Sequence, residues 1–326
     1  MEGKKIIFLI SLPRSGSTLL QKMLTVSPEI YSVAEPWLML PLAFMLKKEG
    51  ALTQYSHKTA FQALEDLIKE LPNGKTDFYR EIENFSFSLY GRMASGKSCK
   101  YFLDKTPRYY LIIPFLAEVF PSAKFIFLFR NPLEVFSSIL TTWKKDRFIL
   151  DKHYVDLYYG PRALSVGYAM LKERAVSVSY NELVKSPEVQ MRKICSYLDI
   201  PFDPSMIQNY RNVKFGGRCG DTTGVNLFDS VSTDSLEKWK KVLNTRYRKW
   251  FSKRYIKNLG NETLAAFGLS ATGLTDEIDS VTGLRMGSLH DMYYHFLSTL
   301  MRLGNAEAFK MLRSSFRSKK RYYPYL

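Results

Sequence analysis

The strongest restriction on the fold comes from a short apolar run near the start of the chain that leads directly into a glycine-containing loop and a helix. Residues Lys5–Ser11 (KIIFLIS) have the continuous apolar character and the β-branched residues of a fully buried strand. Leu12–Gly16 interrupts this run, and Ser17–Val26 (STLLQKMLTV) then has the apolar spacing of a helix. A buried strand, a loop and a helix in this order are the first unit of a parallel α/β fold.

Three further segments predict strands of the same sheet, namely Lys100–Leu103, Lys124–Arg130 and Ala175–Tyr180. Helices are expected between and after these strands, among them Pro132–Leu140, which has a proline at its start, and Glu188–Leu198. Strands that alternate with helices predict a P-loop-like central parallel sheet flanked by helices. Such a sheet binds ligands at the carboxyl ends of its strands.

The 326 residues are consistent with one α/β domain and an extension. We expect the domain over residues 1–269, a flexible linker rich in Gly, Ser, Thr and Asp over 270–287, and a helical, basic C-terminal extension over 288–326. No run reaches the roughly 18 apolar residues of a transmembrane helix, and no export signal is recognisable. The three cysteines are far apart and odd in number, so they do not suggest a disulfide framework. We therefore expect the chain in a reducing compartment, the cytoplasm.

The charge balance of the chain is strongly basic, with 47 Lys and Arg against 31 Asp and Glu and a net charge of +16. This balance implies an anionic partner, such as a nucleotide, an acidic glycan or a membrane surface. No base-reading module is recognisable, so we do not expect nucleic acid as a partner. The absence of a Cys/His cluster predicts no metal site.

The first loop carries groups that bind phosphate. Gly16 allows a tight turn, and the free N–H groups of the helix that follows face an anion. Arg14 adds a planar guanidinium donor, and Ser15, Ser17 and Thr18 add hydroxyls. An ordinary strand–helix turn capped by Ser15 or Ser17 has the same composition, so the loop alone leaves both interpretations open.

A second pair of polar residues follows the strand over 124–130. Arg130 ends this strand, and Ser138 lies eight residues further on, in the expected helix. Together they could hold another phosphate group, although a surface arginine and an unremarkable helical serine are the alternative. Two basic, hydroxyl-rich loops after two neighbouring parallel strands indicate a ligand with two separate phosphate groups.

The segments PRSGSTLL (13–20) and FRNPLEVFSSIL (129–140) resemble the two nucleotide-binding motifs of the sulfotransferases that use 3′-phosphoadenosine 5′-phosphosulfate (PAPS). The resemblance extends over about residues 5–240 and is greatest to bacterial members related to the protein-tyrosine type. It implies that Arg14 through Thr18 bind the 5′-phosphosulfate, and that Arg130 and Ser138 bind the 3′-phosphate. It also implies an in-line transfer of a sulfuryl group to an acceptor hydroxyl.

Other parts of the resemblance occur in the family's order. LDKTP (103–107) is similar to the Lys-containing turn of the family, and VSYNELV (178–184) is similar to a segment whose tyrosine, here Tyr180, lies near the nucleotide. Gly217 and Gly220-Asp221 are loosely similar to a late glycine loop, but the basic pair that precedes that loop in cytosolic members is missing.

The resemblance also implies a catalytic base. Glu35 lies 21 residues after Arg14, where protein-tyrosine sulfotransferases and their bacterial relatives have a catalytic glutamate. A carboxylate at this place can take the proton of the acceptor hydroxyl. Alternatively, Glu35 caps a helix that begins at Pro36. His153 is the second candidate base, since Pro107 stands where many cytosolic members have a histidine.

The same chemistry requires cations at the oxygen that bridges the 5′-phosphate and the sulfuryl group. Lys105 and Arg14 are the candidates, because a cation held there stabilises the charge that develops in the transition state. A structural salt bridge to Asp104 or another neighbour is the alternative role of Lys105. No metal is needed for this chemistry.

A rival motif is Gly91–Ser98 (GRMASGKS), which matches the Walker A pattern and suggests a nucleotide kinase or NTPase. A P-loop must follow a buried strand and begin a helix, whereas we expect a helix before this segment and a strand after it. We therefore interpret it as a helix-to-strand turn. A third possibility is a basic binding protein that keeps the nucleotide pocket without catalysis.

The acceptor is not encoded in a recognisable pattern. The net charge favours a hydroxyl-bearing carbohydrate or lipid, in particular an anionic glycan or glycolipid, and a location at a membrane surface. Residues 238–257 hold nine Lys or Arg and no acid, with aromatic residues among them, and 313–321 add five basic residues. Each segment is either a solvated helix face or a surface for an anionic acceptor or membrane headgroups.

Overall fold

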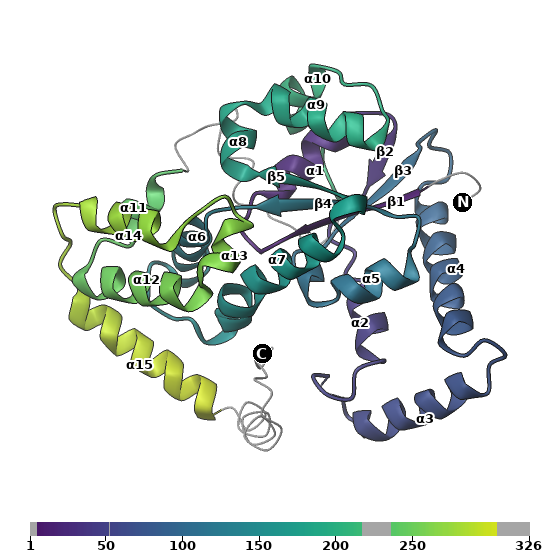
Figure 1. Ribbon diagram of the computed structural model, residues 1–326, viewed down its shortest axis with the longest axis horizontal. Helices are drawn as coiled ribbons and strands as arrows, with labels where there is room; N and C mark the ends of the chain where they lie inside the picture. The colour runs from purple at the N-terminus through teal and green to yellow at the C-terminus, as the bar shows by residue number, and fades with distance from the viewer. Residues whose placement is uncertain (1–4, 52, 217–235, 305–326) are drawn as a thin grey trace. The chain divides into compact units, whose positions relative to one another are not determined.

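The computed structural model describes residues 5–51, 53–216 and 236–304 (Figure 1). These residues form two compact units. The first consists of residues 5–11, 16–128 and 167–216 without residue 52, and the second of residues 12–15, 129–166 and 236–304. No helix within the described ranges is both long enough and apolar enough to cross a membrane.

The first unit is built on a five-stranded sheet with the order β2-β3-β1-β4-β5. β1 pairs in parallel with β3 and with β4, and β2 pairs in parallel with β3. This sheet confirms the predicted α/β class. Its strands are β1 (Lys5–Ser11), β2 (Ile30–Ser32), β3 (Tyr101–Lys105), β4 (Lys124–Phe129) and β5 (Ala175–Ser179).

The apolar run that predicted the first strand is the centre of this sheet. Every residue of β1 after Lys5 is buried, because the strand has a neighbour on both edges and helices flank the sheet. Phe8 packs its ring against Phe120 and Phe125, with centroids 5.2 and 5.7 Å apart. The helices of this unit are α1 (Ser17–Thr25), α2 (Met39–Phe44), α3 (His57–Lys69), α4 (Lys75–Met93), α5 (Ile113–Val119), α8 (Tyr180–Lys185), α9 (Pro187–Leu198) and α10 (Ser205–Gln208).

The second unit is helical. Residues 271–280 form α14, where the sequence predicted a flexible linker, so that expectation was wrong for this stretch. Ser270 caps the helix by accepting a hydrogen bond from Gly273 N, and Leu274 and Ile278 are buried on one face. The domain boundaries at 269 and 287 stay a prediction. The helices are α6 (Pro132–Lys144), α11 (Lys238–Val242), α12 (Arg246–Leu259), α13 (Asn261–Ala265), α14 (Ala271–Ser280) and α15 (Ser288–Gly304), while α7 (Gly160–Met170) passes from this unit into the first.

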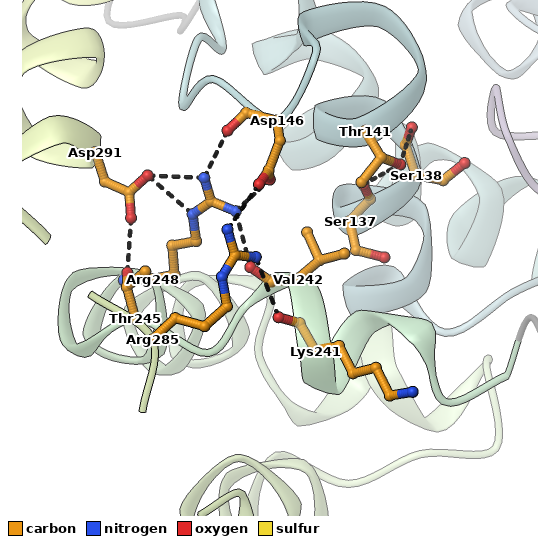
Figure 2. A network of polar contacts seen from close by, with 10 residues as sticks. All are labelled: Ser137, Ser138, Thr141, Asp146, Lys241, Val242, Thr245, Arg248, Arg285 and Asp291. Atoms are coloured by element: carbon orange, nitrogen blue, oxygen red, sulfur yellow. Dashed lines mark hydrogen bonds and ion pairs between the residues drawn. The ribbon is translucent and has the colours of Figure 1, made fainter. Parts of the chain in front are cut away.

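A buried arginine fastens α12 and α15 to the turn after α6. Figure 2 shows that Arg248 lies between two carboxylates: its Nη1 is 2.5 Å from Asp146 Oδ1, and its Nη2 is 2.7 Å from Asp291 Oδ1. Asp291 also accepts a hydrogen bond from Thr245, the N-cap of α12, at 2.7 Å. Asp146 has a φ of 61°, a strained left-handed conformation for a residue other than glycine. The network thus holds a strained turn in place.

The element order also tests the interpretation of the rival motif. Gly91–Ser98 covers the end of α4 and the turn before β3, so helix, turn and strand occur in the reverse of the P-loop order. The proposed kinase loop is therefore absent from this segment, as its context predicted. β2, in contrast, was not predicted, because its three residues are too few to show an apolar pattern.

Candidate functional site

The two loops singled out from the sequence follow the central strands of the sheet. β1 lies between β3 and β4, and the chain leaves β1 toward β2 but leaves β4 toward β5. Neighbouring strands whose connections run in opposite directions form a topological switch point, the usual ligand site of an open α/β sheet. Residues 12–16 follow β1, and Arg130 follows β4 directly.

Arg14 and Ser138, which the resemblance assigned to different phosphates, are in contact in the second unit. Arg14 donates from Nε to Ser138 Oγ at 3.2 Å and from Nη2 to Thr142 Oγ1 at 3.3 Å. The guanidinium carbon also lies 5.7 Å from the centre of the Trp143 ring. Arg14 has a φ of 65°, so the loop keeps a strained residue at its centre.

Arg130 is fixed next to the same loop. Its Nη1 donates to the carbonyl oxygen of Arg14 at 2.9 Å, and its Nε forms an ion pair with Glu134 Oε2 at 2.7 Å. Glu134 is buried in the first turn of α6 and was missed by the sequence analysis. The sequence did carry a signal for Glu134, because an arginine and a glutamate four residues apart can form an ion pair. The pair orients the guanidinium along the loop.

Gly16 and Tyr180 are packed together in the first unit. Gly16 is the N-cap of α1 with a φ of 87°, and as a glycine it supplies no side-chain hydrogen bond to the helix. A Cβ at Gly16 would lie 2.3 Å from Cε2 of Tyr180, so no other residue fits against this ring. Tyr180 begins α8 directly after β5.

Ser15 and Thr18 place hydroxyls along the loop. The Ser15 hydroxyl is buried without a hydrogen-bond partner among the residues that the structure describes. Thr18, in the first turn of α1, accepts a hydrogen bond from Lys105 Nζ at 3.3 Å. Ser17 is the first, buried residue of α1. A buried hydroxyl without a partner costs free energy unless a ligand or water completes its hydrogen bonds.

Lys105 and Glu35 form a buried ion pair in the first unit. Lys105 Nζ lies 2.7 Å from Glu35 Oε1, and the two side chains are 2% and 10% exposed. The indole N–H of Trp37 donates to Glu35 Oε2 at 3.2 Å. Glu35 precedes α2, which begins at Met39 with Leu38 as its N-cap, so Glu35 does not cap that helix. Lys105 pairs with Glu35, not with Asp104.

A buried carboxyl group supports the segment around this pair. Asp104, next to Lys105 on β3, accepts hydrogen bonds from the hydroxyls of Tyr90 at 2.5 Å, Tyr109 at 2.8 Å and Thr106 at 3.3 Å. Burial raises the pKa of Asp104 to about 6 against the lowering effect of these hydrogen bonds and of Lys105. Two of these hydroxyls also accept hydrogen bonds from backbone N–H groups that follow Glu35: Thr106 accepts from Trp37, and Tyr109 accepts from Met39.

His153, the second candidate base, lies in the second unit. It is buried, its Nδ1 is 3.3 Å from Asp156 Oδ2, and its ring stacks on Trp143 with centroids 4.9 Å apart. Trp143 therefore lies against both Arg14 and His153. The late-loop glycines Gly217 and Gly220 lie outside the described residues.

Comparisons with known proteins identify the family of the chain. The profile of the sulfotransferase family matches residues 7–204. The chain is 31% identical over 138 residues to the nodulation protein NoeE of Sinorhizobium fredii, which covers 42% of this chain and 32% of NoeE. It is 25% identical over 242 residues to protein-tyrosine sulfotransferase 1 of Danio rerio, which covers 72% of this chain and 65% of that protein. The matched part is thus less than two thirds of either relative.

The fold has a counterpart among solved structures. The sulfotransferase domain from the curacin biosynthetic pathway superposes with a TM-score of 0.52 at 23% identity, over 78% of this chain and 97% of that domain. The matched family segment is more than half of the chain, and it contains the loop after β1, Lys105 and Tyr180. This chain therefore belongs to the sulfotransferase family.

Proposed function

We propose that this chain transfers a sulfuryl group from PAPS to a hydroxyl of an acceptor, with Glu35 as the general base. The observation that carries the proposal is the buried Lys105–Glu35 pair, which also reaches Thr18 at the start of α1. A carboxylate and a cation beside a phosphate-binding loop are what proton removal and charge stabilisation require. Family membership supports the sulfuryl group as the group transferred.

The loop after β1 is suited to the 5′-phosphosulfate. Gly16 caps α1 without a side-chain hydrogen bond, so the first N–H groups of the helix point toward the ligand position. The buried hydroxyl of Ser15, which has no partner among the residues that the structure describes, matches an anion that accepts hydrogen bonds. Ser17 and Thr18 add hydroxyls in the first turn. When bound, PAPS supplies the sulfuryl group, and its 5′-phosphate is the leaving group.

The second motif is suited to the 3′-phosphate. Arg130 is held by Glu134 and by the Arg14 carbonyl, and Ser138 is held by Arg14, so both side chains are oriented before a ligand arrives. Tyr180, which packs on Gly16, is assigned to the nucleotide by the resemblance.

Glu35 has room for an acceptor hydroxyl. Within the described part of the chain, each of its two oxygens accepts one hydrogen bond, from Lys105 and from Trp37, whereas an ionised carboxylate offers about four acceptor positions. Glu35 takes the proton as the acceptor oxygen bonds to sulfur and the bond from sulfur to the 5′-phosphate oxygen breaks. Lys105 and Arg14 stabilise the negative charge that forms on that oxygen.

The acceptor is a hydroxyl-bearing molecule. One relative is named for its tyrosine acceptor, but the net charge of +16 favours an anionic glycan or glycolipid at a membrane surface. We assign the chain to the cytoplasm on its sequence. Residues 238–257 are a weaker candidate for acceptor binding than their charge suggests, because Arg248, Phe251 and Tyr255 are buried.

Calorimetric titration with adenosine 3′,5′-bisphosphate and with ATP tests the donor. We expect the bisphosphate to bind with micromolar affinity and ATP not to bind, and Arg130→Ala to abolish bisphosphate binding while Lys97→Ala leaves it unchanged. Transfer of labelled sulfate from PAPS to glycan, glycolipid and tyrosine-peptide acceptors tests catalysis. ATP binding that depends on Lys97 overturns the proposal, and tight bisphosphate binding without transfer to any acceptor favours the non-catalytic alternative.

A further inference from the structure

Helix α15 has one face that packs within the second unit and another that exposes large apolar side chains. The covered face packs within the second unit through Asp291, His295 and Ser298. Asp291 binds Arg248, His295 Nδ1 is 2.6 Å from the Tyr247 hydroxyl, and Ser298 Oγ accepts the N–H groups of Leu150 and Asp151 at 2.9 Å each. These contacts fix which side of the helix faces outward.

The outward face is a row of large apolar side chains. Leu289 is 81% exposed and Phe296 is 62% exposed, and the residues on this face follow the i, i+3, i+4, i+7, i+11 spacing of one helical stripe. The stripe is continued by Met286, which is almost fully exposed just before the helix. Its members, which we call the α15 stripe, are Leu289, Met292, Tyr293, Phe296 and Leu300. A contiguous exposed stripe of this kind marks an interaction surface.

The charges of α15, of α12 and of the sequence that follows α15 favour an anionic partner. The one acidic residue of α15, Asp291, is buried. α12, which packs against α15 through Tyr247 and Phe251, has no acidic residue and exposes Arg246, Arg254 and Lys257. Residues 305–326, which lie outside the described residues, carry six Lys or Arg against one Glu in the sequence. A second copy of so basic a chain would be repelled, whereas an anionic surface would be attracted.

We propose that the α15 stripe docks on an anionic lipid surface, with α15 lying in the plane of the headgroups. An apolar face with aromatic and long aliphatic side chains and basic residues beside it is the pattern of interfacial helices. The inference does not depend on sulfuryl transfer, since no residue of the stripe belongs to the proposed catalytic machinery.

Co-sedimentation of the full chain with phosphatidylcholine vesicles, with and without phosphatidylserine, tests the proposal. We expect binding only to the vesicles that contain phosphatidylserine, with a decrease at high salt. The double substitution Leu289→Gln with Phe296→Gln should weaken binding at least about tenfold, because both side chains leave the apolar contact. The matched control is Leu67→Gln with Phe85→Gln, an exposed leucine and phenylalanine on α3 and α4, which should bind as the wild type does.

Thermal melting and bisphosphate affinity equal to those of the wild type show that the double variant is folded. The single variants Leu289→Gln and Phe296→Gln repeat the vesicle-binding comparison with a smaller change to the helix. Equal binding by the α15 variant and its control overturns the proposal, as does a complete lack of vesicle binding by the wild type. Sedimentation velocity tests whether the stripe instead binds a second copy of the chain. A wild-type dimer that becomes a monomer in the double variant would assign the stripe to that contact and overturn the proposal.

Discussion

Lys105 Nζ lies 2.7 Å from Glu35 Oε1, and both side chains are withdrawn from solvent. The pairing of β2 with β3 brings the two segments together: Ser32, the last residue of β2, is level with Leu103, and Glu35 and Lys105 follow three and two residues later. Glu35 therefore stands beside the end of β3, although 70 residues separate the two side chains in the sequence.

The first prediction concerns this carboxylate. Glu35→Gln should lower turnover by about 10²–10⁴-fold, since an amide cannot take the acceptor proton. Bisphosphate affinity should stay within about twofold, because Glu35 is not assigned to the nucleotide. The measurements are sulfate transfer from PAPS at saturating acceptor and calorimetric titration of the same preparation.

His153→Gln is the matched comparison for the base. Its ring stacks on Trp143 and pairs with Asp156, so we expect only a small loss of turnover. A large loss in the His153 variant together with an active Glu35 variant would transfer the base role to His153.

The second prediction concerns the contact between Gly16 and Tyr180. Gly16→Ala should cost about 2–4 kcal/mol of unfolding free energy, since the methyl group meets the tyrosine ring at 2.3 Å and φ is 87°. Gly96→Ala is the control: φ is 74°, and an added Cβ would have no atom of the described residues within 4 Å, so the substitution should cost only about 1 kcal/mol. Urea unfolding measures both.

A double-mutant cycle separates the clash from the backbone strain. In a Tyr180→Ala background, Gly16→Ala should cost about as much as Gly96→Ala, because the ring is gone. Equal costs of the two glycine substitutions in the wild-type background would contradict the steric role of Gly16.

The sequence could predict the elements whose information is local. β1 and β4 are apolar runs bounded by turn residues, and the groups proposed to bind phosphate, Arg14 through Thr18, occupy five consecutive positions. β2 is only three residues long and owes its existence to pairing with β3. Without β2, the sequence could not bring Glu35 next to Lys105, and the candidate base rested on the resemblance alone.

For α14 the local composition predicted a linker where the chain forms a helix. Its Gly, Ser, Thr and Asp residues suggested a linker, but Ser270 acts as an N-cap and Leu274 and Ile278 bury one face. β3 shows a similar limit: Asp104 and Lys105 belong to the strand, not to the turn after it, because distant tyrosines and Glu35 satisfy their polar groups. Tertiary partners of this kind leave no local pattern.

The third prediction is a pH dependence of stability. The pKa of Asp104 is raised from 3.8 to about 6 in the folded chain, so the folded state binds this proton more tightly than the unfolded state. The contribution of Asp104 to the unfolding free energy is therefore greatest below about pH 4 and falls by about 3 kcal/mol as the pH rises to about 6 and beyond. Asp104→Asn should remove this decrease, as measured by urea unfolding across that range.

Tyr90→Phe tests how far a hydrogen bond opposes the effect of burial on the pKa of Asp104. The hydroxyl of Tyr90 lowers the pKa of Asp104 by donating to its carboxylate, so its removal should extend the decrease in stability to higher pH. The same pH profile in wild type, Asp104→Asn and Tyr90→Phe would show that other groups dominate this range.

The fourth prediction compares the two arginines that share Asp146 (Figure 2). Arg248 is 2% exposed, and its loss by Arg248→Met leaves Asp291 buried without its cation, which should cost about 3–5 kcal/mol. Arg285→Met removes an arginine that is 45% exposed and should cost less than about 1 kcal/mol. Both are measured by urea unfolding at neutral pH.

The loss of unfolding free energy in Arg248→Met should come mainly from the Asp291 carboxylate, which stays buried without a cation. Combining it with Asp291→Asn should therefore restore part of the lost stability, because a neutral amide can be buried without a cation at a lower cost than a carboxylate. Because Arg248 also holds the strained turn at Asp146, directly after the helix that bears Ser138, the single variant should bind the bisphosphate more weakly than Arg285→Met does. Equal stability and equal affinity of the two single variants would mean that the network does not support α6.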